Sequence, residues 1–377
     1  MRRIIYISGT RADYGLMAST LRRVRAHPDC ELSLIVTGMH LSPEHGNTMT
    51  EIEQDGLPIL ARVPLPMDTS TGAGMACAIG YMIMQFTQTL EQARPDVVLL
   101  LGDRGEMLAG AIAAAHLGIP IMHIHGGERS GTIDEPVRHA ISKLSHWHCV
   151  ATQQSRDRLI RMGEQERHIT VTGAPGLDGL AETPRADRAA LFHSQGFNPG
   201  LPLALMVFHP VMQEANRAAE QVATLLNAVL AHNYQVLALK PNSDAGSTAI
   251  AQVLESMRNS PGLRVLTHLR RPEFISWMAA ADLMVGNSSS GIIEAATFGT
   301  PVLNVGARQN LRERNSNVLD CGTDAVSING ALKQLQQASG GATAVNVYGD
   351  GLASQRIAAL LATAPLDTSI LMKSNVY

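Results

Sequence analysis

The sequence predicts an α/β protein made of two Rossmann-like, doubly wound halves that face each other across a central cleft. Short apolar runs alternate with helical patterns in both halves of the chain, which is typical of parallel sheets covered by helices. A proline-rich segment interrupts this alternation near the middle of the sequence. A chain of 377 residues is also too long for one ordinary hydrophobic core. We therefore expect two domains, at residues 1–175 and 176–377.

The first half begins with four apolar runs, at Ile4–Ser8, Leu32–Val36, Val98–Leu101 and Ile119–Ile124. Each run is followed by a turn that contains glycine and then by a helical pattern, which indicates βαβ units with right-handed crossovers. Apolar residues with helical spacing over Met75–Gln92 predict a long helix that leads into Pro95. Two further runs, near His148–Ala151 and at Ile169–Val171, would complete the first sheet.

The segment Gly173–Pro202 breaks this rhythm, because it holds four prolines among scattered charges, as a domain boundary does. Five more apolar runs follow, each before a helical stretch: Leu203–Phe208, Gln235–Leu239, Leu263–Leu266, Leu283–Val285 and Val302–Val305. They predict a second sheet of similar size. The last helical stretch, Leu352–Leu361, suits packing on either half, including a return to the first domain.

Composition excludes several classes of protein. A formal net charge of −3 gives no reason to expect a nucleic acid or an acidic membrane as a partner. The four cysteines stand far apart without a CxxC pair, which argues against a disulfide framework or a cysteine zinc site. The segment MRRIIYISGTRADYG has the pattern of a first strand and turn, not of a signal peptide. No apolar run reaches the roughly 18 residues of a membrane span. We expect a soluble, cytoplasmic protein.

The stretch Leu101–His148 gathers acidic and imidazole groups after two predicted strands. Its carboxylates are Asp103, Glu106, Glu128, Asp134 and Glu135, and its histidines include His123, His125, His139, His146 and His148. The carboxyl ends of parallel strands form the edge where ligands bind in open α/β sheets. The stretch therefore predicts proton-transfer chemistry at that edge.

Two alternatives to proton transfer stay open for this stretch. The first is helix capping, because Thr132–Glu135 has capping-box spacing. Asp134 with Arg138 and Glu135 with His139 are also stabilising i,i+4 pairs. The second is a metal site, which the absence of HxxxH and HExxH spacing disfavours. We expect no metal and no other cofactor.

Two turns are candidates for phosphate binding. Gly9–Gly15 follows the first strand and opens a helix whose amides attract phosphate, with Arg11 available for a bidentate contact. Gly286–Gly291 carries three serines before a helical segment, and Glu294 is placed to accept hydrogen bonds from ribose hydroxyls. Purely structural roles are also open for both, as an ordinary turn of this fold class and as a serine N-cap. Neither is a GxGxxG fingerprint, so a nicotinamide cofactor is not supported.

A series of motifs then resembles one enzyme family. GTRADYG, VTGMH with HGNT, LGDR, HIHGGE, IDE with VRHAISKLSH, FHP, GNSSSGIIE and NVGARQ occur in order between Ile4 and about Arg314. They are similar to motifs of the hydrolysing UDP-N-acetylglucosamine 2-epimerases of bacterial sialic acid biosynthesis. The resemblance implies a GT-B-like fold and the conversion of UDP-N-acetylglucosamine and water into N-acetylmannosamine and UDP. UDP leaves by anti elimination, and the resulting 2-acetamidoglucal is hydrated with inversion at C2.

The resemblance also implies roles for individual residues. Asp103 and Asp134 match the catalytic carboxylates of the family. His125 stands where several members carry a third carboxylate, so His125 and Glu128 are both candidates for the remaining proton transfer. The matching nucleotide contacts are His209, Ser288, Ser289, Glu294 and Arg308, together with Arg11, Arg104, Asn242 and His268. The family further implies a homo-oligomer, either a dimer or a tetramer. Leu16 departs from the animal enzyme, which has a lysine there.

The motifs do not identify the sugar. The main expectation is UDP-N-acetylglucosamine, and the alternative is UDP-2,4-diacetamido-2,4,6-trideoxyglucose of the legionaminic acid pathway, which differs only at C4 and C6. Three weaker alternatives are a non-hydrolysing epimerase, a glycosyltransferase of the same fold and a nucleotide-sugar-binding module without activity. The HIHGGE and RHAISK forms of the motifs argue against the non-hydrolysing enzyme.

Overall fold

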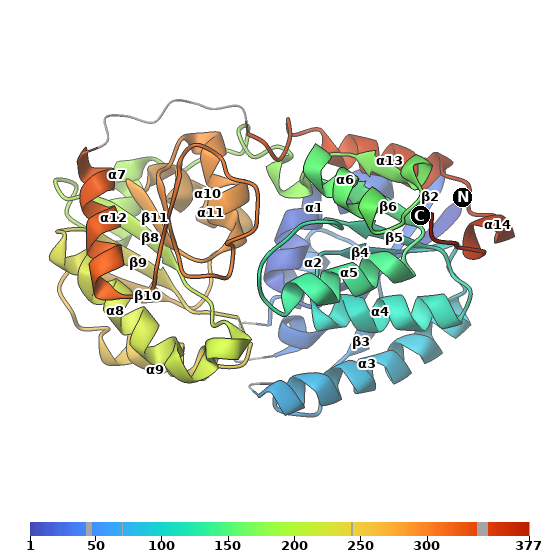
Figure 1. Cartoon of the computed structure of the whole chain (residues 1–377), viewed down its shortest axis with the longest axis horizontal. Helices are drawn as coiled ribbons and strands as arrows, with labels where there is room; N and C mark the ends of the chain where they lie inside the picture. Colours follow the sequence, from blue (N-terminus) through green and yellow to red (C-terminus); the bar gives the residue numbers. More distant parts are fainter. Residues whose placement is uncertain (43–46, 70, 243, 338–345, 377) are drawn as a thin grey trace.

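The computed structural model describes residues 1–42, 47–69, 71–242, 244–337 and 346–376. It consists of two α/β lobes side by side, each built on a fully parallel sheet (Figure 1). This confirms the predicted class, two doubly wound halves in a GT-B-like arrangement. His45 and Gly46 of the HGNT motif lie outside the described residues.

The first sheet has seven strands in the order β3-β2-β1-β4-β5-β6-β7. They are β1 (Arg2–Ser8), β2 (Cys30–Thr37), β3 (Ile59–Val63), β4 (Val97–Leu101), β5 (Ile121–Ile124), β6 (Trp147–Val150) and β7 (Ile169–Val171). All five residues of β4 are buried because helices cover both faces of the sheet, which accounts for the continuous apolar run. The sequence did not predict β3, an edge strand in which buried and exposed positions mix.

The second sheet has six strands in the order β10-β9-β8-β11-β12-β13. They are β8 (Leu203–Val207), β9 (Gln235–Leu239), β10 (Leu263–Leu266), β11 (Leu283–Gly286), β12 (Val302–Val305) and β13 (Val318–Cys321). β13 was also not predicted, because no residue of this edge strand is fully buried. In both sheets the strand order switches sides beside the first strand, between β1 and β4 and between β8 and β11. Ligands of doubly wound sheets bind at such switch points.

Helices cover both sheets. Those before the second sheet are α1 (Arg11–Ala26), α2 (Met49–Gln54), α3 (Gly72–Ala93), α4 (Gly105–His116), α5 (Asp134–Leu144), α6 (Gln153–Arg161) and α7 (Arg188–Gln195). The later ones are α8 (Ala218–Ala231), α9 (Ser247–Ser256), α10 (Arg271–Ala280), α11 (Ser289–Ile293), α12 (Ala325–Gln337), α13 (Ala353–Thr363) and α14 (Thr368–Leu371). Among the described residues, no helix is long and apolar enough to cross a membrane.

The last helices return to the first lobe, where α13 lies near α6 (Figure 1). α13 packs against α1, and its residues Ile357 and Leu361 belong to the same buried cluster as Leu21. The Trp147 indole N–H also donates to the Pro365 carbonyl at 3.1 Å. The sequence left two packings open for the helical stretch Leu352–Leu361. The structure shows this stretch packed on the first lobe.

Candidate active site

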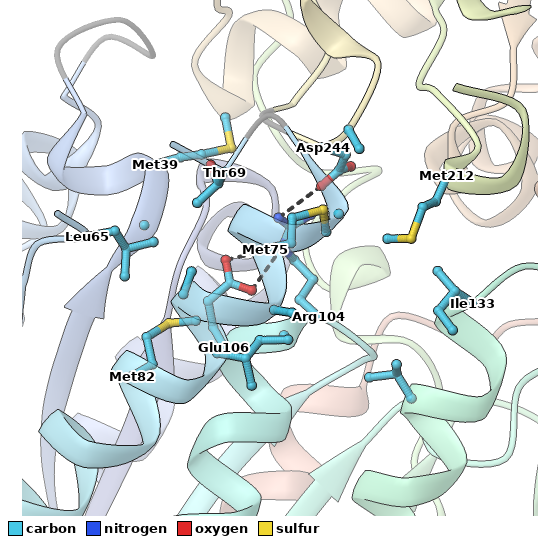
Figure 2. A pocket seen from close by; sticks show the side chains of 18 of the residues that line it. Met39, Leu65, Thr69, Met75, Met82, Arg104, Glu106, Ile133, Met212 and Asp244 are labelled. Atoms are coloured by element: carbon cyan, nitrogen blue, oxygen red, sulfur yellow. Dashed lines mark hydrogen bonds and ion pairs between the residues drawn. The ribbon is translucent and has the colours of Figure 1, made fainter. Parts of the chain in front are cut away.

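A cavity of about 910 Å³ is lined by residues of both lobes. Asp103, Arg104 and Asp134 line it from the first lobe, and Asp244 and Arg308 line it from the second. Figure 2 shows Arg104 at the centre of this cavity, between Glu106 and Asp244. In the folded protein, Asp103 therefore lies near Asp244 and Arg308, which are far from it in the sequence.

The predicted nucleotide contacts of the second lobe share one position in the fold, the carboxyl end of a strand. His209 follows β8, Asn242 follows β9, His268 follows β10, Ser288 and Ser289 follow β11, and Arg308 follows β12. Glu294 directly follows α11. From the first lobe, Arg11 donates to the Thr267 carbonyl at 2.8 Å and contacts His268 Nδ1 at 2.9 Å. Arg11 thus contacts the second lobe at His268, although neither of these residues lines the cavity.

Asp103 is held by a buried arginine that the sequence analysis considered only as a helix-stabilising partner of Asp134. Arg138 of α5, only 1% exposed, hydrogen-bonds to the Asp103 carboxylate and donates to Glu128 Oε2 at 2.9 Å. Its expected role was an i,i+4 pair with Asp134, but the structure directs it to Asp103 and Glu128 instead. Its position in the VRHAISKLSH motif, one helical turn after Asp134, was the available signal.

Glu128 lies at the centre of a buried ion cluster. Besides Arg138, it contacts His125 and Arg312, and Arg312 comes from the second lobe. Burial alone would raise the pKa of Glu128, but the neighbouring His125 and Arg312 charges and their hydrogen bonds lower it to about 2. The Glu128 side chain is therefore a carboxylate at neutral pH, and both of its oxygens are engaged.

A tight turn after β5 positions His125. His125 has a φ of 62°, which is uncommon for a residue other than glycine. The turn needs Gly127, because a Cβ atom there would lie 2.3 Å from the Ser155 carbonyl oxygen. His125 is buried and its Nδ1 contacts Glu128, so the ring does not line the cavity wall.

Asp134 begins α5 and lines the cavity. The capping box that the sequence left open as an alternative does not form there, because Glu135 accepts the backbone N–H groups of Ser130 and Gly131, at 2.9 and 3.0 Å. Glu135 therefore holds the preceding loop, and its ion pair with His139 spans 3.8 Å. Asp134 accepts a hydrogen bond from the Thr132 hydroxyl at 3.1 Å, which orients its carboxylate beside the cavity.

His209 is a neutral donor or acceptor at the cationic end of the site. Burial, and then repulsion from Arg308, lower its pKa to about 3. Its Nδ1 is buried without a hydrogen-bond partner in the described part of the chain. Asn287, which the sequence did not single out, accepts from the His209 N–H at 2.7 Å, and its carbonyl accepts from Arg308 at 3.1 Å.

The serine-rich turn combines a capping role with features that suit a ligand. Ser288 caps the short helix α11, as a serine N-cap is expected to do. Gly286, with a φ of 131°, lets β11 approach β8 so closely that a Cβ atom would lie 2.1 Å from the Val207 carbonyl oxygen. Glu294 is buried and paired with Arg271, but its Oε2 has no partner among the described residues. That oxygen remains available to a ligand hydroxyl.

Asp244 pairs with Arg104 in the cavity, so an anionic ligand of Arg104 would have to compete with it. It accepts from Arg104 at 3.2 Å, and attraction to Arg104 and Arg308 lowers its pKa, although burial alone would raise it. We expect Asp244→Asn to tighten UDP binding about two- to fivefold, as for a partly exposed ion pair. Titration calorimetry at low salt measures this, with the exposed Asp320→Asn as the control. Unchanged or weaker binding to Asp244→Asn would contradict the competition.

Three buried histidines make the stability of the protein sensitive to acid. Burial lowers the pKa of His123 and His209 to about 3 and that of His146 to about 4. Since the unfolded chain takes up these protons near pH 6.5, the free energy of unfolding falls as the pH drops below 6.5. Each histidine contributes about 2 kcal/mol to this loss at pH 5.

Urea denaturation at pH 7 and pH 5 tests this expectation. His123→Asn should reduce the difference in unfolding free energy between the two pH values, whereas the exposed His193→Asn should leave it unchanged. An equal difference in His123→Asn and in the unmodified protein would show that His123 does not contribute.

Two parallel sheets that share a cavity lined by charged residues of both lobes define a GT-B-like protein with a candidate site between the lobes. A family model described as UDP-N-acetylglucosamine 2-epimerase matches residues 22–362. The chain therefore belongs to the UDP-N-acetylglucosamine 2-epimerase family.

Individual relatives are similar over most or all of the chain. A hydrolysing UDP-N,N'-diacetylbacillosamine 2-epimerase of Legionella pneumophila is 49% identical, and the match covers 100% of both chains. A UDP-N-acetylglucosamine 2-epimerase of Neisseria meningitidis is 35% identical, over 89% of this chain and 87% of the relative. A crystal structure of UDP-GlcNAc 2-epimerase from Neisseria meningitidis, bound to UDP-GlcNAc, has a TM-score of 0.79 at 18% identity, covering 95% of this chain and 99% of that one.

Proposed function

We propose that this chain hydrolyses and epimerises UDP-2,4-diacetamido-2,4,6-trideoxyglucose, which is UDP-N,N'-diacetylbacillosamine. The products would be UDP and 2,4-diacetamido-2,4,6-trideoxymannose, with one water consumed. The observation that carries the choice of sugar is the full-length 49% identity to the Legionella pneumophila enzyme, against 35% to the Neisseria meningitidis enzyme for UDP-N-acetylglucosamine. It favours the alternative substrate over the main expectation from the motifs.

The second lobe would hold most of the nucleotide, and Arg11 and Arg104 would add contacts from the first lobe. Arg104 and Arg308 supply positive charge at the cavity wall, and the neutral His209 supplies a ring N–H for a phosphate oxygen. Ser288 and Ser289 lie at the start of α11, and the free Oε2 of Glu294 can accept from a ribose hydroxyl. Arg11, Asn242 and His268 complete this set. Stabilisation of the departing diphosphate is the first requirement of the reaction, because the C2 proton becomes acidic only as C1 gains oxocarbenium character.

Asp103 and Asp134 would act on the sugar. Both carboxylates line the cavity, as removal of the C2 proton and hydration of the glycal require. Arg138 binds Asp103 from behind and Thr132 binds Asp134, so each carboxylate has a fixed orientation. Elimination breaks the C1–O bond to UDP and the C2–H bond. Hydration then adds hydroxyl at C1 and a proton at C2 from the opposite face.

We assign Glu128 a positioning role. Its engaged oxygens and its pKa of about 2 suit an anion that fixes Arg138, and through it Asp103, more than a group that exchanges protons. His125 contacts Glu128 through Nδ1 and its ring does not line the cavity, so Nε2 is the ring atom that would have to transfer a proton. This leaves His125 as the candidate for the third proton-transferring group.

The test is to incubate the enzyme with each UDP-sugar in D2O and to follow UDP release and the sugar product by NMR. We expect faster turnover of the trideoxy sugar, free UDP, and deuterium at C2 of the product. Faster turnover of UDP-N-acetylglucosamine would restore the main expectation from the motifs. A UDP-linked epimer without free UDP would indicate a non-hydrolysing enzyme, and no turnover of either sugar would refute the proposed function.

A further inference from the structure

The cavity extends from Arg104 along an apolar wall. Met39, Leu65, Met75, Ile79 and Met82 line this part, which we call the apolar arm. Met39 follows β2, Leu65 follows β3, and the other three belong to α3. In Figure 2, Met39, Leu65, Met75 and Met82 surround Glu106 and Arg104. The polar residues that also line this part are Glu106, which pairs with Arg104, and Ser42, Asp68 and Thr69 of the neighbouring loops.

The sequence of α3 builds the arm. Met75, Ile79 and Met82 recur at spacings of four and three, so they lie on one face of the helix. This face is held against the start of α4, where a Cβ atom on Gly105 would lie 2.8 Å from Ile79 Cγ1. Met82 is buried and Met75 is half-buried. The arm is thus a formed surface directly beside Arg104.

The chemistry of the two candidate sugars differs at the positions that would face this surface. C1 carries the diphosphate, which the cationic residues Arg104 and Arg308 would hold. C4 lies across the ring from C1, and its neighbour C5 carries C6. That far edge carries hydroxyls at C4 and C6 in UDP-N-acetylglucosamine, but an acetamido group at C4 and a methyl group on C5 in the trideoxy sugar. Thioether and aliphatic groups bury a methyl well, whereas a hydroxyl buried against them loses its water without gaining a strong partner.

We propose that the apolar arm selects the 6-deoxy sugar by receiving the methyl group on C5 and the methyl of the C4 acetamido group. This inference rests on the proposed function and adds the residues that determine its specificity. Specificity would arise because the thioether and aliphatic groups of the arm bury a methyl group favourably but offer a hydroxyl no strong hydrogen bond, a difference worth about one to two orders of magnitude in kcat/KM.

The experiment compares kcat/KM for the two UDP-sugars in Met75→Gln, Met75→Leu and Met84→Gln. Glutamine and leucine have nearly the volume of methionine, so polarity is the main change in the first variant. Met84 lies on the same helix but is 58% exposed and does not line the cavity, which makes it the matched control. Leu65→Gln is the second test of the arm, from a different segment, if Met75→Gln does not fold.

We expect Met75→Gln to reduce the preference for the trideoxy sugar by about tenfold or more. Met75→Leu and Met84→Gln should keep the preference, and UDP affinity should stay unchanged in all three. If the unmodified enzyme prefers UDP-N-acetylglucosamine, both the proposed function and the arm are wrong. If it prefers the trideoxy sugar but neither Met75→Gln nor Leu65→Gln changes that preference, or Met84→Gln changes it equally, the arm alone is wrong.

Discussion

Asp103→Asn and Asp134→Asn are each expected to lower kcat by about 10²- to 10⁴-fold, the contribution of a positioned acid or base. The amide keeps the shape of each side chain but removes its basicity, so neither proton transfer at C2 nor activation of water at C1 proceeds. The dissociation constant for UDP should change little, because the proposed nucleotide contacts come mainly from the second lobe. The effect therefore belongs in kcat and not in UDP affinity.

Single-turnover kinetics with the trideoxy UDP-sugar, together with calorimetric titration of UDP, separates chemistry from binding. Asp157→Asn is the matched control, because its carboxylate lies on α6, half-exposed and outside the cavity. Loss of UDP binding together with turnover would show that Asp103 or Asp134 maintains the fold of the site. Near-normal turnover in either variant would remove that residue from the chemistry.

The two edge strands show which part of the fold could not be predicted from the sequence. Central strands such as β4 are buried on both faces, so they appear as uninterrupted apolar runs. β3 contains Arg62, which pairs with Glu53, and β13 contains Asp320, which pairs with Arg314. Edge positions tolerate these charges because one side of the strand faces solvent or a loop. Because neither segment has an uninterrupted apolar run, its sequence pattern does not distinguish it from a turn.

The sequence predicted where the candidate site lies in the fold, but not which of its charged residues pair with each other. Acidic and imidazole residues directly after apolar runs indicated the ligand-binding edge, because strand ends of a parallel sheet meet there. Which charges pair depends on how the lobes pack. Arg312 reaches Glu128 across 184 positions of sequence, and Arg104 reaches Asp244 across 140. No local spacing records such contacts, so the role of Arg312, and the partners of Arg138, emerged only in three dimensions.

Glu128→Gln is expected to lower the free energy of unfolding by about 3–5 kcal/mol, as when one partner of a buried ion pair is removed. Arg138 and Arg312 would then lie close together in a buried site without the Glu128 carboxylate. Their positive charges would be stabilised neither by that carboxylate nor by water. Because the pKa of Glu128 lies near 2, its stabilising contribution is complete above pH 4.5 and is lost as the pH falls toward 2. Urea denaturation at pH 7 measures the full loss.

A double-mutant cycle shows whether this loss comes from the charge cluster. Arg312→Met removes one of the two buried cations, so Glu128→Gln should cost much less in that background than in the unmodified enzyme. Additive costs would mean that Glu128 stabilises the protein through other contacts. A Glu128→Gln variant as stable as the unmodified enzyme would contradict the cluster altogether.

The pH dependence of kcat in the same Glu128→Gln variant separates positioning from catalysis. If Glu128 only fixes Arg138 and Asp103, kcat falls but the shape of its pH profile stays the same, because other groups carry the protons. If Glu128 itself exchanges a proton during turnover, its replacement removes one limb of the profile. A lost limb would therefore transfer the third proton-transfer role from His125 to Glu128, and an unchanged shape would leave His125 as the group to replace next.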